Sequence, residues 1–361
     1  MVWKMVIILA LIVLVSGTAY LTAAVGRFGL IQKLPKRWQR ILSSLALIGA
    51  AFAACMFAMS FINAVIVFFH VVFFFLVYGL IVRVISKIAG RKPRVNWQGW
   101  LALLTSAGYL AFAFYLCHSV RQTEYRLTSS KLHEPLKIVM FADSHINAVF
   151  DGEGFAKHIE TINAQNPDIV LIPGDFVDDG TTRSDMIRAC EALGTINAKY
   201  GVWYTFGNHD RGYYSTRNYT EEELTAELER NHVHVMKDAV ECVGDLCIVG
   251  REDKSRSQRR TAAELVAEAD PEKYIIVLDH QPSDYENEAE TAADLVVSGH
   301  THGGQLIPIT YVGEWLGMND RTYGYERRNN TDFIVTSGIA DWEMDFKTGT
   351  ISEYVIITVN S

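Results

Sequence analysis

Residues 294–308, DLVVSGHTHGGQLIP, contain the pattern on which the fold depends. An apolar run typical of a buried strand ends in His300 and His302, and two glycines follow. Residues two apart on an extended chain point to the same side, so both imidazoles face one place beyond the strand. We expect Gly303 and Gly304 to let the backbone approach a substrate or metal closely.

Four further apolar runs also end in polar side chains. LKIVMFADSH ends with Asp143 and His145, PDIVLIPGDFVDD contains Asp175, YGVWYTFGNHD contains Asn208 and His209, and KYIIVLDH ends with His280. Steps of 32 and 33 residues separate Asp143, Asp175 and Asn208, which suits successive strand–helix units. Because ligands gather beyond the carboxyl ends of strands in open α/β sheets, we expect these side chains to lie together.

Helix-like segments separate these strands. GFAKHIETINAQ and SDMIRACEALGTI have amphipathic spacing, and TEEELTAELERN opens with Thr220 and Glu223 at the spacing of a capping box. The closing segments, DFIVTSG and EYVIITV, read as strands without helices between them. Strongly apolar strands that alternate with helices predict a sheet covered by helices on both sides, and hence an α/β layered domain.

The polar set has a specific chemistry. Two carboxylates, one amide oxygen and four imidazoles are ligands that Mn, Fe and Zn accept, and the lack of Cys argues against a structural zinc site. Two divalent ions about 3.5–4 Å apart, sharing one carboxylate, would use all seven ligands and activate a water. His209 would then be free to donate a proton to a leaving oxygen or to bind a phosphate oxygen. Each histidine alone is more often a packing or surface residue, but burying five such clusters without ligands would be costly.

The clusters DSH, GDFVDD, GNHD, DH and GHTHGGQ resemble the signature of the calcineurin-like metallophosphoesterases, in order and spacing, across residues 136–360. The extension HGGQ and the ending SGIADWEMDFKTGTISEYVIITV are similar to the membrane-associated bacterial subgroup of YkuE and UDP-2,3-diacylglucosamine pyrophosphatase-like proteins. The resemblance implies a β-sandwich flanked by helices. Where the subgroup often has an Arg near the final strand, this chain has Lys347, which would lose planar two-pronged phosphate binding.

The resemblance also implies a role for each site residue. Asp175 would bridge the two ions, and His209 would be the catalytic histidine. The first ion would be held by Asp143, His145, Asp175 and His302, and the second by Asp175, Asn208, His280 and His300. We expect Asp178 and Asp179 to be solvated, the alternative being hydrogen bonds to neighbouring ligands.

Charge divides the chain into two parts. No Asp or Glu precedes Glu124, whereas that stretch carries 12 of the 33 Lys and Arg residues. Residues 124–361 hold 21 basic and all 41 acidic side chains, a formal charge of −20. So negative a domain argues against nucleic acid as a partner, because that binding depends largely on cations that neutralise phosphates.

The basic part contains four apolar runs, at about 5–25, 41–60, 64–82 and 100–117. A bilayer core needs roughly 20 apolar residues per helix, so we predict a four-helix transmembrane domain at 1–121, with a tight turn at Asn63. A cleaved signal peptide is the alternative for the first run, but signal cores span only about 7–15 residues. A linker at 122–135 and a metallophosphoesterase domain at 136–361 would follow.

Loop charges predict the orientation. GRFGLIQKLPKRWQR and RVISKIAGRKPR each hold five basic residues and should be cytoplasmic, which makes the acidic domain extracytoplasmic. Arg121, Arg126 and Lys131 dilute this bias.

Cys242 and Cys247 flank a predicted hairpin turn, where they would form a disulfide in an oxidising compartment or fill the sheet as free thiols.

Two functions follow from these observations. The first is a multi-pass cell-membrane phosphoesterase with two divalent ions, Mn, Fe or Zn, acting on a lipid-linked or envelope phosphate compound, or on a soluble nucleotide or sugar phosphate. The second is a membrane sensor or transporter whose outer domain binds phosphate compounds. His70, inside the third apolar run, would matter in the second function, although it could simply hydrogen-bond to a neighbouring helix. The sequence does not indicate the oligomeric state.

Overall fold

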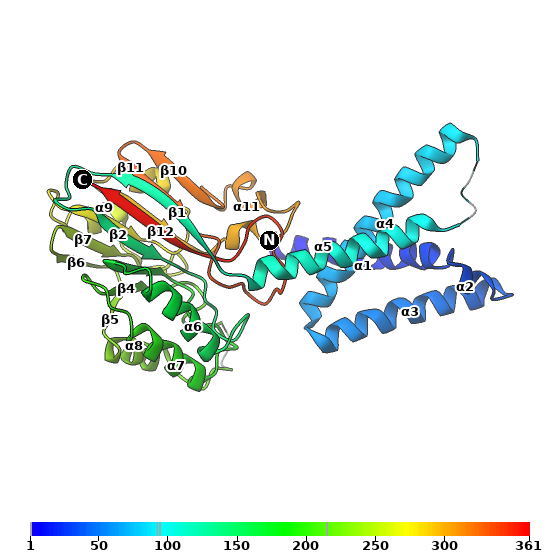
Figure 1. The fold of residues 1–361 in the computed structure, drawn as a ribbon, viewed down its shortest axis with the longest axis horizontal. Coiled ribbons are helices and arrows are strands. Elements are labelled where there is room, and N and C mark those ends of the chain that lie inside the picture. Colours follow the sequence, from blue (N-terminus) through cyan, green and yellow to red (C-terminus); the bar gives the residue numbers. More distant parts are fainter. Residues whose placement is uncertain (1, 92, 94, 214–215) are drawn as a thin grey trace. The chain divides into compact units, whose positions relative to one another are not determined.

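The computed structural model describes residues 2–91, 93, 95–213 and 216–361. It contains two compact units, shown in Figure 1. The helical unit comprises residues 1–114 with Glu343–Asp345, and the α/β unit comprises Tyr115–Trp342 with Phe346–Ser361.

The helical unit consists mainly of long apolar helices: α1 (Val2–Val25), α2 (Gly29–Gln32), α3 (Arg37–Ala58), α4 (Phe61–Ala89) and α5 (Trp97–His118). Of these, α3, α4 and α5 are long and apolar enough to cross a membrane. In α1 the apolar stretch found among the described residues is Leu11–Val25, which is shorter than a span. The structure therefore supports three of the four predicted spans.

The turn expected at Asn63 lies slightly earlier, between the end of α3 and the start of α4. Ser60 is the N-cap of α4, and its hydroxyl accepts the backbone N–H of Asn63. His70 donates from Nδ1 to the Ile66 carbonyl, 2.8 Å away on its own helix, and its ring lies 5.4 Å from that of Tyr109. The predicted partner on a neighbouring helix is thus replaced by a bond within α4.

The α/β unit contains two six-stranded sheets instead of the single sheet that the alternation of strands and helices predicts. The first sheet has the order β1-β12-β2-β3-β4-β5, and the second β10-β11-β9-β8-β7-β6. The strands of the first are β1 (Arg121–Thr128), β12 (Glu353–Asn360), β2 (Leu136–Met140), β3 (Ile169–Pro173), β4 (Val202–Thr205) and β5 (Val233–Met236). Those of the second are β10 (Gly324–Arg328), β11 (Thr331–Val335), β9 (Leu295–Ser298), β8 (Tyr274–Leu278), β7 (Leu246–Gly250) and β6 (Ala239–Val243).

Three apolar layers hold the sheets and helices together. Ile138, Leu171 and Ile276 belong to the layer in which residues of both sheets meet. On the other face of the first sheet, its strands pack against α6 (Gly152–Asn163), α7 (Arg183–Leu193) and α8 (Glu221–Arg230). On the second sheet, α9 (Ala262–Val266) and α10 (Tyr285–Glu288) do the same. The unit is thus a β-sandwich flanked by helices, as the family resemblance implies.

Two local features add to this description. The stretch expected to be a polar linker, 122–135, contains most of β1, which pairs in parallel with β12 from Arg121 opposite Glu353 to Thr128 opposite Asn360. Cys242 and Cys247 face each other across β6 and β7 and form a disulfide, with Cα atoms 4.0 Å apart. Of the two alternatives left open for these cysteines, the disulfide is the one observed.

Candidate metal centre

The polar clusters follow the carboxyl ends of five strands, β2, β3, β4, β8 and β9. Adjacent strands β2, β3 and β4 are parallel, and so are β8 and β9, so their ends lie at the same edge of each sheet. The backbone turns sharply there. Five of the seven predicted ligands have positive φ angles between 36° and 72°, namely Asp143, His145, Asp175, His300 and His302. Such conformations cost of order 1–3 kcal/mol each and cluster at functional sites, because the surrounding structure must hold them in place.

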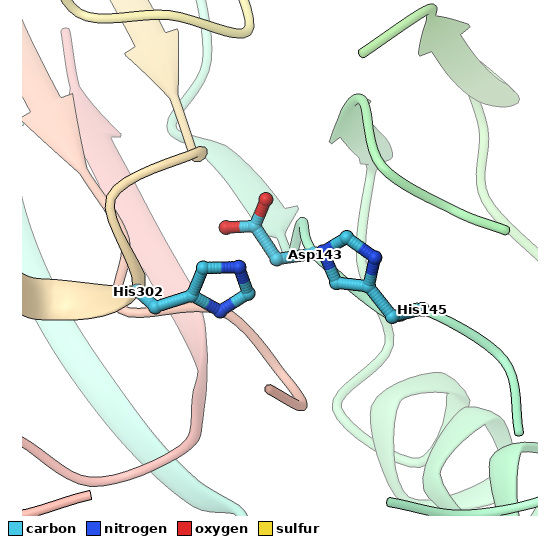
Figure 2. Close-up of side chains that lie close together, drawn as sticks. All are labelled: Asp143, His145 and His302. Atoms are coloured by element: carbon cyan, nitrogen blue, oxygen red, sulfur yellow. The ribbon is translucent and has the colours of Figure 1, made fainter. Parts of the chain in front are cut away.

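Figure 2 shows the first group of side chains, Asp143, His145 and His302. All three are buried, and each offers a ligand atom within 4.8 Å of the others. The two imidazole rings are stacked, with centroids 5.1 Å apart. A carboxylate and two imidazoles arranged in this way could hold a metal ion.

A second group consists of Asp175, His280 and His300, whose ligand atoms also lie within 4.8 Å of one another. His280 donates from Nδ1 to the Pro173 carbonyl at 2.9 Å, which directs Nε2 towards the site. Nε2 lies 3.1 Å from Oδ1 of Asn208 and 3.1 Å from Oδ2 of Asp175. A backbone bond that fixes one ring nitrogen while the other faces oxygen ligands is the arrangement of metal-bound histidines.

Asp175 belongs to the second group but also lies close to the first. Its Oδ2 is 3.6 Å from Nε2 of His145 in the first group and 3.1 Å from Nε2 of His280 in the second. Gly207 packs so close to Asp175 that an added Cβ would overlap its carboxylate. Asp175 is therefore within reach of imidazoles from both groups.

The buried polar atoms provide a test of whether ions fit here. Neither ring nitrogen of His145 has a hydrogen-bond partner among the described residues, and the same holds for Nδ1 of His302. The nearest carboxylate oxygens lie 3.5 and 3.6 Å from His145, beyond good hydrogen-bond geometry. Buried polar atoms left without partners are costly and rare, and a cation bound by His145 and His302 would remove that cost. The donor set fits divalent ions.

The electrostatics of the groups differ strongly within a small volume. Burial raises the pKa of Asp143 to about 6. Burial alone would lower the pKa of His145, but the carboxylates of Asp178 and Asp175 prevail and raise it to about 9. Burial and the nearby His280 lower the pKa of His300 to about 4, so this imidazole is neutral and ready to act as a ligand.

His209 has a different environment from the other histidines. Its backbone N–H donates to Oδ1 of Asp175 at 2.8 Å, and its Nδ1 donates to Oδ1 of Asp178 at 3.0 Å. The second bond leaves Nε2 available to a substrate. Asn208, beside it in the chain, contributes its oxygen to the second group and its amide to the hydroxyl of Tyr213, 2.7 Å away.

Asp178 is buried, so the expectation of a solvated side chain is wrong for this residue. Its Oδ1 lies 3.0 Å from Nδ1 of His209 and its Oδ2 lies 3.5 Å from Nδ1 of His145, and these imidazoles hold its pKa well below the usual range despite its burial. Asp179 accepts the backbone N–H of Tyr213 at 2.9 Å. The position of Asp178, three residues after a ligand in GDFVDD, was the only signal in the sequence.

Sequence reasoning also missed Asp210, which is completely buried. Its carboxylate accepts the backbone N–H groups of Asp175, Phe176, Val177 and Gly207. It therefore ties the loop after β3 to the loop after β4. No spacing rule distinguishes this residue from a surface aspartate.

Lys347 and the paired glycines differ from expectation. Lys347 is completely buried and donates to the Ser337 carbonyl at 2.7 Å, so it is placed to support the protein interior instead of binding phosphate. It lies 3.9 Å from Asp341, whose other oxygen is 3.3 Å from Nδ1 of His302. A Cβ on Gly303 or Gly304 would collide with a neighbouring threonine, so these glycines permit loop packing in place of the predicted approach to a ligand.

Comparison with known proteins agrees with this geometry. The family model described as calcineurin-like phosphoesterase matches residues 136–304. YkuE of Bacillus subtilis, an uncharacterised metallophosphoesterase, is 30% identical over 294 residues, which cover 76% of this chain and 99% of YkuE. An uncharacterised metallophosphoesterase of Campylobacter jejuni is 30% identical over 233 residues, or 63% of this chain and 60% of that protein.

The name of one vertebrate relative describes it as a transmembrane protein. The transmembrane protein with metallophosphoesterase domain of Danio rerio is 27% identical over 320 residues, which cover 81% of this chain and 71% of that protein. The family implies a metal-dependent hydrolase. With a relative matched over almost its whole length and the family's motifs brought to one edge of the sandwich, this chain belongs to the calcineurin-like phosphoesterase family.

Proposed function

We propose that this protein is a membrane-anchored dimetal phosphoesterase that hydrolyses phosphoester or pyrophosphate bonds with a metal-activated water. The observation that carries the proposal is that the Asp175 carboxylate lies close to imidazoles of both groups of candidate ligands. In this proposal residues 1–121 form the membrane domain and residues 136–361 the catalytic domain.

Each predicted site residue has a place in this mechanism. Asp143, His145 and His302 hold one ion, and Asn208, His280 and His300 hold the other, with Asp175 shared by both. The two ions, Mn, Fe or Zn, supply Lewis acidity towards the phosphoryl oxygens and lower the pKa of a water molecule.

His209 acts on the leaving group. Its Nδ1–H is bonded to Asp178, which orients the ring. Nε2 then donates a proton to the leaving oxygen or a hydrogen bond to a non-bridging phosphate oxygen. Asp178 works through His209 and His145 and does not touch the substrate.

The location and substrate class are part of the proposal. The positive-inside pattern supports an extracytoplasmic catalytic unit on a multi-pass protein, and the Cys242–Cys247 disulfide is in keeping with an oxidising compartment. A lipid-linked or envelope phosphate compound, of the kind processed by UDP-2,3-diacylglucosamine pyrophosphatase-like proteins, is the substrate class that a membrane anchor favours.

The test is hydrolysis of bis(p-nitrophenyl) phosphate and of the matching monoester by the purified full chain, with and without added Mn. Turnover that requires metal and is lost in Asp175→Asn supports the proposal. Asp270→Asn makes the same change at an exposed position and should retain full activity. Turnover that survives both metal removal and Asp175→Asn would refute the dimetal mechanism.

A further inference from the structure

The segment Leu306–Met318 begins four residues after His302 and exposes an unusual amount of apolar surface. We call it the apolar loop. Its six large apolar side chains, each 52–74% exposed, are Ile307, Ile309, Tyr311, Trp315, Leu316 and Met318. Elsewhere among the described residues of the α/β unit, the large hydrophobic side chains that are more than a third exposed are three tyrosines, Tyr115, Tyr213 and Tyr325. Such a concentration of exposed apolar side chains marks an interaction site.

Hydrogen bonds and packing hold the apolar loop in a defined conformation. Ile307 donates its backbone N–H to Oγ1 of Thr348 at 2.7 Å, and Thr310 packs against Gly304 with its side chain buried. The short helix α11 (Val312–Trp315), labelled in Figure 1, lies in its centre. The exposed side chains are therefore held outwards by the fold.

The charge of the apolar loop indicates what covers it. Residues 303–319 contain no Lys or Arg, and Glu314 is their one acidic residue. The Glu314 carboxylate accepts the backbone N–H of Thr322, so it is engaged with the protein itself. An uncharged surface with Trp, Tyr and branched aliphatic side chains fits the boundary between the headgroups and acyl chains of a bilayer.

The connection between α5 and β1 keeps the start of the sandwich close to any bilayer that α5 crosses. Helix α5 is one of the three helices apolar enough to cross a membrane, and it ends at His118. Strand β1 begins at Arg121, so the covalent chain holds the start of the sandwich within about 10 Å of the end of that helix. A lipid surface is the one apolar partner whose proximity this connection ensures.

We propose that the apolar loop inserts into the surface of the lipid bilayer and holds the neighbouring metal centre at the level of the phosphate headgroups. The substrate class is then a phosphate compound embedded in the membrane. This rests on the proposed function for the substrate, whereas the insertion itself does not. His300 and His302 join the apolar loop through only a few residues, so insertion would fix the height of the ligands above the bilayer.

Insertion is tested in the full chain with Leu316→Cys, labelled with the environment-sensitive dye NBD in a Cys55→Ser background. The protein is placed in nanodiscs of phosphatidylglycerol and phosphatidylethanolamine, with and without doxyl-labelled lipid. Glu229→Cys on α8, an exposed polar position, is the matched control. We expect blue-shifted emission and at least a twofold loss of intensity with doxyl lipid at position 316, and neither at position 229.

The contrary results are equally clear. Emission at position 316 that doxyl lipid leaves unchanged overturns the insertion. The insertion is overturned in this way whether the emission wavelength indicates that the dye is in water or is blue-shifted by contact with protein, for example a second copy of the chain.

The substrate class is tested with Trp315→Ser combined with Leu316→Ser. On bis(p-nitrophenyl) phosphate in solution, we expect turnover within twofold of the unmodified protein, because neither residue is near the predicted ligands in the chain. On an acylated p-nitrophenyl phosphodiester embedded in the nanodiscs, we expect at least a tenfold loss. Unchanged turnover of the embedded probe, or none by the unmodified protein, overturns the substrate class. If neither probe is hydrolysed, the proposed function fails while dye quenching still decides the insertion.

Discussion

Each unit of this protein contains a histidine shielded from solvent, but the ring nitrogens differ in their partners: His70 is half-buried and His145 is completely buried. His70 in the helical unit satisfies its Nδ1 within its own helix, through the Ile66 carbonyl. His145 in the α/β unit has neither ring nitrogen in a hydrogen bond to any residue that the structure describes, although it is completely buried beside two carboxylates. A polar side chain satisfied locally is explained by packing. A set of polar side chains that converge without satisfying one another requires a ligand.

The same contrast holds for other buried polar side chains of the two units. Ser106 in α5 donates to the Ala102 carbonyl, one turn earlier in its own helix. Asp143 instead accepts the backbone N–H of His300, 157 residues away in the sequence. Long-range convergence of this kind costs chain entropy and strained backbone, so it indicates function more strongly than burial does.

Asp175→Asn is the change expected to have the largest effect. The amide would weaken binding at both ion positions, so we expect kcat/KM for an aryl phosphodiester to fall by about 10³-fold or more. Steady-state kinetics with saturating Mn would measure it, with Asp270→Asn as the control. A loss below tenfold would mean that Asp175 is not shared by two ions.

His209→Ala should be the next most damaging change. Loss of a positioned proton donor lowers kcat by about 10²–10⁴-fold, while metal content should remain that of the unmodified protein. His133→Ala, at an exposed histidine, is the control. Equal loss of activity and of bound metal in His209→Ala would instead make His209 a ligand.

Asp178→Asn tests whether the buried carboxylate orients His209 and His145. We expect activity to fall by about 10–100-fold, the range for residues that support ligands without binding the ion. The loss should appear in kcat with KM nearly unchanged, because Asp178 acts through His209 and does not touch the substrate. A loss that appears in KM with kcat unchanged would contradict this role.

The pH dependence of metal binding follows from the shifted pKa values. With a pKa of about 9, His145 is protonated below pH 9 in the absence of metal, and an ion must displace that proton. Affinity for Mn should therefore fall between pH 9 and 6, by up to about tenfold per pH unit. Below pH 6, where Asp143 also protonates, the fall should be steeper. Titration calorimetry in buffers of different ionisation enthalpy would measure the released protons, and a pH-independent affinity would contradict this account.

His70→Ala should have the smallest effect. Its hydrogen bond and ring contact are local to the helical unit, so we expect phosphodiesterase activity within about twofold of the unmodified protein. If His70→Ala abolished function in cells while Asp175→Asn left it intact, the sensor or transporter alternative would replace the enzyme.

Much of the site could be predicted because strand ends impose a simple geometry. Asp143, Asp175 and His300 each follow an apolar strand, and parallel strands bring their carboxyl ends together. Asp210 and Asp341 could not be predicted in this way. Their contacts depend on how loops fold against one another, and neither periodicity nor local spacing encodes that arrangement.

The fold shows the same division. Strands and helices could be located from their apolar patterns, and the capping box at Thr220 and Glu223 is present as expected. The division of the strands into two sheets could not be predicted, because the strand pattern alone does not indicate which strands are neighbours. β1 was read as a linker because its side chains are mostly exposed, and its partner β12 lies more than 200 residues later.

The most direct test of the central claim is elemental analysis of metal bound to the purified full chain and to Asp175→Asn. We predict two divalent ions per chain in the unmodified protein and one or none in the variant. An unmodified chain that binds no ion after loading with Mn, Fe or Zn, or a variant that retains both ions, would contradict a dimetal centre built around Asp175.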